Sequence, residues 1–156
     1  MTLAQGRPYI AIPGPSVIPD RVLRAMHAAA PDIYDDALAE MTAGIARDLK
    51  SVARTRGEVA MYAANGHGAW EAALANTVPP GGRVLALCTG RFGEGWAQMA
   101  EGLGLGVERL DFGRRAAIDP ERVRAALAAD GAGRINAVLM THVDTSSSVC
   151  NDPAPL

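Results

Sequence analysis

The chain has 156 residues, of which 49% are hydrophobic and 21% are charged, so it can bury one core as a globular protein. The net charge of -2 and the scattering of arginines among Asp and Glu exclude a basic stripe for nucleic acid. No segment has the pattern of a signal peptide or the length of a bilayer-spanning stretch. We therefore expect a cytoplasmic protein with no nucleic-acid or membrane partner.

The first long helix is predicted after a pair of acidic residues, with Asp35 or Asp36 as its cap. Apolar residues then recur every three or four positions, which places one apolar stripe along the helix: Leu38, Met41, Ile45, Leu49 and Val52. We expect this stripe to pack against another element. Segment 58–63 is short, apolar and followed by Asn-Gly, which is typical of a buried strand that feeds a turn.

From residue 66 onward the pattern alternates between helix and strand. A helix beginning at Gly66 is ended by the Pro-Pro-Gly-Gly run at 79–82. Asp119 suits a helix cap, and Pro120 suits the first helical position. The remaining elements are predicted as strands at 83–88, 107–112 and 135–141, and helices at 92–103 and from 120 to 129.

This alternation predicts the fold class. Strands separated by helices are typical of βαβ units, so we expect an α/β fold whose mostly parallel sheet has helices on both faces. We divide the chain into an N-terminal arm with a first helix, 1–34, and a partial large domain, 35–156. A crossover helix would normally follow the fourth strand, so we expect the C-terminal half of the fold to be absent.

Three turns follow predicted strands, at the edge where parallel sheets bind ligands: 64–68, 89–93 and 142–148. The first, Asn65-Gly66-His67-Gly68, lies at a helix start and has few bulky side chains. Its backbone N–H groups and the helix dipole could together hold an anion. An ordinary turn is the alternative for this motif, and a place in the core is the alternative for Trp70 and Phe92.

Two other chemistries find no support in the spacing of the residues. His142, Asp144 and the serines at 146–148 lack the Gly-x-Ser-x-Gly turn of a hydrolase nucleophile. The histidines and cysteines lack metal-ligand spacing, so we expect no metal site. Cys88 and Cys150 are interpreted as reduced thiols.

Four segments of the chain occur in a characteristic order. They are Pro13-Gly14-Pro15 with residues 19–26, the run 66–76, Gly90-Arg91-Phe92-Gly93, and the run 141–147. Together they resemble class V pyridoxal-phosphate aminotransferases, and within these the serine-glyoxylate and alanine-glyoxylate enzymes. Trp70 and Asn151-Asp152 favour the serine-glyoxylate branch. The resemblance runs from about residue 10 to the end and implies an incomplete large domain of the fold-type I transferases.

The resemblance implies pyridoxal 5′-phosphate as the cofactor. Asn65, Gly66 and His67 would hold its phosphate, Phe92 would stack on its ring, and Thr145 would donate its hydroxyl to the phenolic oxygen. The resemblance also implies a homodimer that transfers an amino group from a small amino acid to a 2-oxo acid such as glyoxylate. Ser148 stands where the family usually has a glycine, which would tighten the turn after Thr145.

The family's Schiff-base lysine belongs to a segment downstream of those matched here. The chain has one lysine, Lys50, at a position where the family has none. We therefore expect a fragment that has the phosphate and ring contacts but no catalytic residue of its own. Two alternatives stay open: a non-catalytic phosphate-binding or assembly fragment, and a pyridoxal-phosphate-dependent lyase or desulfurase.

Overall fold

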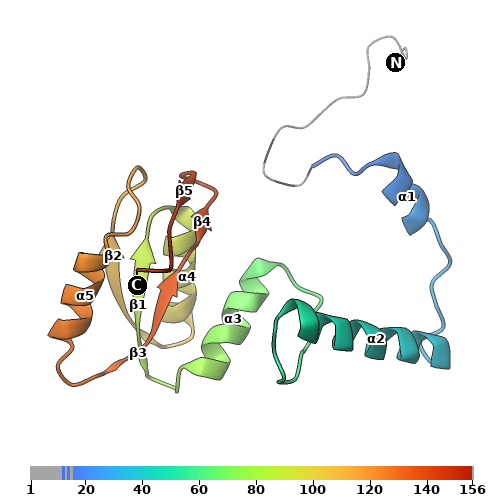
Figure 1. Cartoon of the computed structure of the whole chain (residues 1–156), viewed down its shortest axis with the longest axis horizontal. Coiled ribbons are helices and arrows are strands. Elements are labelled where there is room, and N and C mark those ends of the chain that lie inside the picture. The colour runs from blue at the N-terminus through green and yellow to red at the C-terminus, as the bar shows by residue number, and fades with distance from the viewer. Residues whose placement is uncertain (1–11, 13, 15, 156) are drawn as a thin grey trace, which may run out of the picture. The chain divides into compact units, whose positions relative to one another are not determined.

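The computed structural model describes residue 12, residue 14 and residues 16–155 (Figure 1). The chain divides into two compact units, Met1–Tyr62 and Ala63–Leu156. Among the helices of the described residues, none combines the length and the apolar character needed to cross a membrane.

The described residues of the first unit form two helices, α1 (Asp20–Met26) and α2 (Asp36–Val52). The carboxylate of Asp35 accepts the N–H of Ala37 at 3.1 Å, which confirms the predicted cap. The expected packing of the apolar stripe is wrong for the described residues, because α2 has no buried residue. Part of the stripe lines an open groove of about 580 Å³ with Ile33, Val59 and Met61.

Segment 58–63 forms no strand, which contradicts the prediction. Met61 is 49% exposed and Tyr62 is 65% exposed, so the segment is not buried either. A strand depends on backbone hydrogen bonds to a neighbour, and among the described residues no strand pairs with this one. The composition of this segment favours a strand, but composition does not show whether a second strand is present to pair with it.

The second unit is an α/β structure, as predicted (Figure 1). In chain order its elements are α3 (Gly66–Thr77), β1 (Arg83–Cys88), α4 (Arg91–Gly102), β2 (Gly106–Asp111), α5 (Pro120–Ala129), β3 (Ile135–Met140), β4 (Val143–Asp144) and β5 (Val149–Cys150). Strand β1 is central and pairs in parallel with β2 on one side and β3 on the other, and β4 and β5 form an antiparallel hairpin.

Side chains of β1 alternate between two hydrophobic clusters, one on each face of the sheet. Val84, Ala86 and Cys88 pack with residues of α3 and α4, whereas Leu85 and Leu87 pack with Val123 of α5 and its neighbours. These five side chains of β1 are at most 1% exposed. Helices therefore cover both faces of the parallel sheet, as the alternation of elements predicts.

The order β2-β1-β3 creates a topological switch point at the carboxyl end of β1. The chain passes from β1 through α4 to β2 on one side, and then through α5 to β3 on the other side. In open parallel sheets, ligands bind in the crevice outside such a point. Turn 89–93 and the hairpin 143–150 follow the two strands, β1 and β3, that meet there.

Replacement of Leu85 by alanine should lower the free energy of unfolding of the second unit. Leu85 is fully buried in the central strand, and emptying such a site costs about 2–5 kcal/mol. Urea unfolding can be followed by the fluorescence of Trp70 and Trp96, both of which lie in this unit. The control is Leu127→Ala, because Leu127 is 40% exposed and should cost much less. Equal unfolding midpoints for the two variants would contradict the assignment of the core.

Candidate functional site

Asp144 of β4 is a fully buried carboxylate at the switch point. Its Oδ2 accepts the backbone N–H groups of Phe92 at 2.9 Å and Gly93 at 3.1 Å, in the first turn of α4. Its Oδ1 accepts the N–H of Ser146 at 3.1 Å and the hydroxyl of Ser146 at 2.6 Å. Because the residue before α4 provides no side-chain cap, a carboxylate from the distant hairpin takes that role.

Gly90 leaves the space that this carboxylate needs. A Cβ on Gly90 would lie 2.5 Å from Cγ and Oδ1 of Asp144, so a larger residue would push the carboxylate away. The backbone N–H of Arg91 also donates to the hydroxyl of Ser146 at 2.7 Å. Turn 89–93 and the hairpin are thus joined by direct hydrogen bonds, and two of the three predicted turns come together.

The pKa of Asp144 is lowered by its hydrogen bonds. Burial alone would raise it, but the hydroxyl of Ser146 and the amides of Gly93, Ser146 and Phe92 outweigh burial. The carboxylate is therefore ionised at neutral pH. Its contribution to stability is present above the ordinary aspartate pKa and is lost as the pH falls through the lowered value.

Asn151 is a buried amide that ties the ends of β1 and β3 together. Its Nδ2 donates to the hydroxyl of Thr89 at 3.0 Å and to the carbonyl of Thr141 at 2.7 Å. Its Oδ1 accepts the N–H of Ile118 at 3.0 Å. The buried amide oxygen and nitrogen of Asn151 therefore both have hydrogen-bond partners, and these bonds hold the carboxyl ends of β1 and β3 in a fixed relative position.

The turn at the start of α3 is exposed. Asn65 caps the helix, since its Oδ1 accepts the N–H of His67 at 3.1 Å, and the N–H of Gly68 donates to the carbonyl of Asn65 at 3.0 Å. The amide of His67 is thus already bonded, so an anion there would have to replace Asn65 Oδ1. Around Gly66 the turn is open, because an added Cβ would meet no atom within 4 Å.

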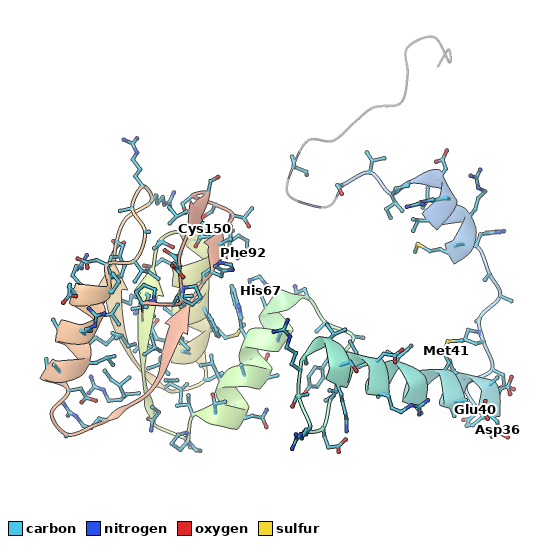
Figure 2. The ribbon with its side chains drawn as sticks, in the orientation of Figure 1. Asp36, Glu40, Met41, His67, Phe92 and Cys150 are labelled. Carbon is cyan, nitrogen blue, oxygen red and sulfur yellow. The ribbon has the colours of Figure 1, made fainter. Side chains whose placement is uncertain are left out.

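A row of aromatic rings connects this turn with the start of α4. Trp70 lies 4.8 Å from His67 and 6.2 Å from Phe92, measured between ring centroids, and both contacts are edge-on. Trp70 also stacks on Trp96 at 5.4 Å. Phe92 is half-buried, and Figure 2 shows it at the same end of the unit as His67. Turn 64–68 is therefore connected to turn 89–93 through the ring of Trp70, which contacts both His67 and Phe92.

Thr145 lies in the exposed turn between β4 and β5, directly between Asp144 and Ser146. The structure thus places Thr145 next to the residues that bind the start of α4. The assignment of the phosphate and ring contacts to Asn65, Gly66, His67, Phe92 and Thr145 stays a prediction.

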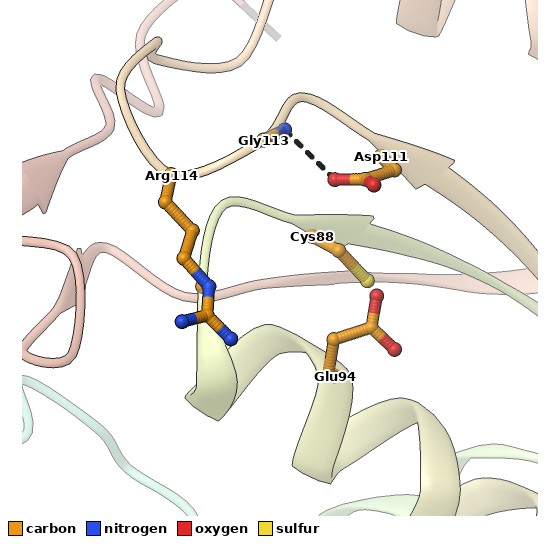
Figure 3. A pocket seen from close by; sticks show the side chains of 6 residues that line it. Cys88, Glu94, Asp111, Gly113 and Arg114 are labelled. Carbon is orange, nitrogen blue, oxygen red and sulfur yellow. Dashed lines mark hydrogen bonds between the residues drawn. The ribbon is translucent and has the colours of Figure 1, made fainter.

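A small pocket that the sequence did not indicate opens at the carboxyl ends of β1 and β2 (Figure 3). It has a volume of about 240 Å³ and is lined by Cys88, Gly90, Glu94, Asp111, Gly113 and Arg114. Asp111 accepts the N–H of Gly113 at 2.7 Å. Burial, followed by the neighbouring Glu94, raises the pKa of the Cys88 thiol to about 12. The available signal for this pocket was that Cys88 and Asp111 lie at the carboxyl ends of two predicted strands, 83–88 and 107–112.

Comparisons with known proteins show which proteins this chain is similar to. No protein-family model matches the chain. The serine-glyoxylate aminotransferase of Methylorubrum extorquens is 37% identical over 154 residues, which cover 97% of this chain and 38% of that protein. The soluble hydrogenase 42 kDa subunit of Anabaena cylindrica is 33% identical over 92% of this chain and 37% of its own length. The crystal structure of an aspartate aminotransferase from Thermus thermophilus matches with a TM-score of 0.77 and 30% identity, over 92% of this chain and 39% of that chain.

The chain is a homologue of the glyoxylate aminotransferases. This glyoxylate aminotransferase homologue spans a little over a third of the length of the curated relatives above, 38% and 37%. The predicted resemblance and the α/β fold with a parallel sheet are both confirmed.

The two cysteines of this homologue should differ sharply in reactivity towards a thiol reagent. Cys150 is exposed, whereas Cys88 is buried and its raised pKa keeps it in the unreactive thiol form. At pH 8 the native chain should consume one equivalent, and the unfolded chain two. Cys150→Ser should remove the native reaction, and fast reaction of native Cys88 would contradict its placement.

Since native Cys88 stays protonated while the unfolded thiol ionises, the free energy of unfolding should also fall as the pH rises from 9.0 towards 12.

Ser148→Gly should stabilise the second unit. Ser148 has a φ of 60°, a left-handed conformation that costs a residue with a Cβ about 1–2 kcal/mol, part of which returns as the greater chain entropy of glycine. We expect a net gain of about 0.5–1 kcal/mol in thermal unfolding. Ser147→Gly is the matched control and should destabilise, because Ser147 does not have a positive φ and its hydroxyl bonds the backbone of Asp144 and Val149. A loss of stability in Ser148→Gly would show that the turn does not have this conformation.

Proposed function

We propose that this chain supplies the phosphate and ring contacts of a pyridoxal 5′-phosphate-dependent aminotransferase that transfers an amino group from a small amino acid to a 2-oxo acid such as glyoxylate. The observation that carries the proposal is the difference between two glycine-containing helix starts. The start of α4 is filled by the carboxylate of Asp144, whereas the start of α3 is exposed. The names of the relatives support the reaction class.

The start of α3 suits a phosphate dianion. Gly66 and His67 present amides at the positive end of a helix of 12 residues, and no side chain blocks the approach to Gly66. A bound phosphate would take the amide of His67 from Asn65 Oδ1. The Asn65 side chain could then turn its own NH2 group towards the phosphate, because an amide offers both a donor and an acceptor.

Phe92 and Thr145 suit the aromatic ring of the cofactor. The backbone of Phe92 is held by Asp144, and its half-buried ring provides a flat apolar face that excludes water. Thr145 has an exposed hydroxyl on the hairpin that is bonded to the same turn. When bound, the cofactor acts as an electron sink for the substrate carbon at which bonds change.

No catalytic residue of this chain is assigned. Lys50 lies in α2 of the first unit, where it pairs with the carboxylate of Glu58 at 3.0 Å, whereas all the proposed contacts lie in the second unit. We therefore propose that amino transfer needs a lysine other than Lys50. We also propose residues 1–34 as an arm and 35–156 as part of the large domain of a cytoplasmic homodimer. The exposed apolar side chains of the first unit, such as Met41, Val52 and Tyr62, support an association with another chain.

Pyridoxamine 5′-phosphate should bind to the chain and quench the fluorescence of Trp70 and Trp96. This form of the cofactor has an amine in place of the aldehyde and needs no lysine. Phe92→Ala should weaken its binding about tenfold, in line with the loss of one aromatic stacking contact, and should leave the binding of inorganic phosphate unchanged.

The control is Phe112→Ala, which removes the other phenylalanine of the chain. Phe112 packs on the α5 face beneath the Arg122 guanidinium, so its loss should not change the affinity for either ligand. An absence of saturable binding in the wild-type chain would contradict the proposed function.

A further inference from the structure

The start of α4 is an anion site that the protein fills with its own carboxylate. Helix α4 has 12 residues and begins after the central strand β1, a position where many proteins bind a phosphate. Here the carboxylate of Asp144 occupies that position, and both of its oxygens accept hydrogen bonds from the chain itself. A cap from a distant residue differs in its effect from a cap by the residue directly before the helix.

Three other helices of the chain use a local cap. Asp35, Asn65 and Asp119 each lie directly before their helix and accept the N–H of the residue two positions later. Such a cap stabilises one helix start and fixes nothing else. Helix α4 instead has Gly90 at this position, and its cap is Asp144, which lies 52 positions after Phe92 and 51 after Gly93. A distant cap fixes the relative position of two segments.

The two segments joined by Asp144 are those that carry the proposed ring contacts. Phe92 is itself one of the bonded amides, and Thr145 lies between Asp144 and Ser146, whose hydroxyl and amide bond to the same carboxylate. The start of α3 has its own hydrogen bonds, through Asn65, and none of them involves Asp144. The carboxylate therefore acts on one part of the site and not on the other.

We propose that Asp144 is a positioning residue that holds Phe92 and Thr145 in one geometry and thereby sets the affinity for the ring of the cofactor but not for its phosphate. This inference rests on the proposed function. It assigns the buried carboxylate a task in ligand selection: without it, the site should bind a bare phosphate as before and lose its preference for a phosphate that carries a ring.

The test compares two ligands, pyridoxamine 5′-phosphate and inorganic phosphate, in the full chain and its Asp144→Asn variant. The asparagine keeps the shape of the side chain but replaces a charged acceptor that serves both segments with a neutral group. We expect the affinity for pyridoxamine 5′-phosphate to fall about tenfold, as for the loss of one or two charge-assisted hydrogen bonds. The affinity for inorganic phosphate should stay within about twofold.

Two further variants keep the test decisive. Asp152→Asn makes the same charge change at an exposed carboxylate that accepts the nearby amide of Ala154, and it should bind both ligands like the wild type. Ser146→Ala removes one bond to Asp144 and the acceptor of the Arg91 amide, so it should give a smaller loss for the ring ligand alone. If Asp144→Asn does not fold, Ser146→Ala decides.

The possible results separate this inference from the proposed function. If the wild-type chain binds neither ligand, the proposed function fails and the role of Asp144 falls with it. If the wild type binds both and Asp144→Asn binds both equally well, only the positioning role is overturned. An equal loss for the two ligands in Asp144→Asn would also overturn it, because that result indicates general damage to the fold.

Discussion

The carboxylate of Asp144 lies against the first turn of α4, where two backbone N–H groups and the positive end of the helix stabilise its charge. Gly90 provides no side chain that could cap the helix in its place. The relative position of the turn after β1 and the hairpin after β3 consequently depends on Asp144, together with the bond from the Arg91 amide to the Ser146 hydroxyl. Asn151 stabilises the same region, because its side chain donates to Thr89 and Thr141, which follow the two strands.

The arrangement gives two helix starts different tasks. At α4, the protein's own carboxylate satisfies the amides and fixes the position of Phe92. At α3, the neutral side chain of Asn65 accepts the amide of His67 and can give it up to a stronger anion. The aromatic row through Trp70 links the two starts. In the proposed function, the open start holds the phosphate and the closed start positions the ring.

Local signals in the sequence were enough to predict most of the second unit. Asp119 caps its helix where expected, and the burial of every residue from 84 to 88 follows from a strand covered on both faces. Segment 58–63 was predicted wrongly because a strand needs a partner, and the apolar residues of one segment do not reveal whether a partner is present. The predicted packing of the apolar stripe on α2 was wrong for the same reason, because periodicity identifies an apolar face but not the element that covers it.

The roles of Asp144 and Asn151 could not be predicted, because each bonds to groups that are distant in sequence and come together only in the folded sheet. Asp144 lay within a recognised segment, yet nothing local distinguishes a buried carboxylate from an exposed one. One signal was available: a glycine stands at the cap position before a helix, which leaves its amides to a distant acceptor. Likewise, the bond from His67 to Asn65 shows that a turn with few side chains can still satisfy its own amides.

Carbon-13 and amide NMR across an acid titration tests the central interaction most directly. The account predicts that the Asp144 carboxyl titrates below the ordinary aspartate pKa, and that the amide signals of Phe92 and Gly93 shift with the same midpoint. A midpoint at or above the ordinary value, or amide signals that do not respond to it, would show that Asp144 does not hold the start of α4.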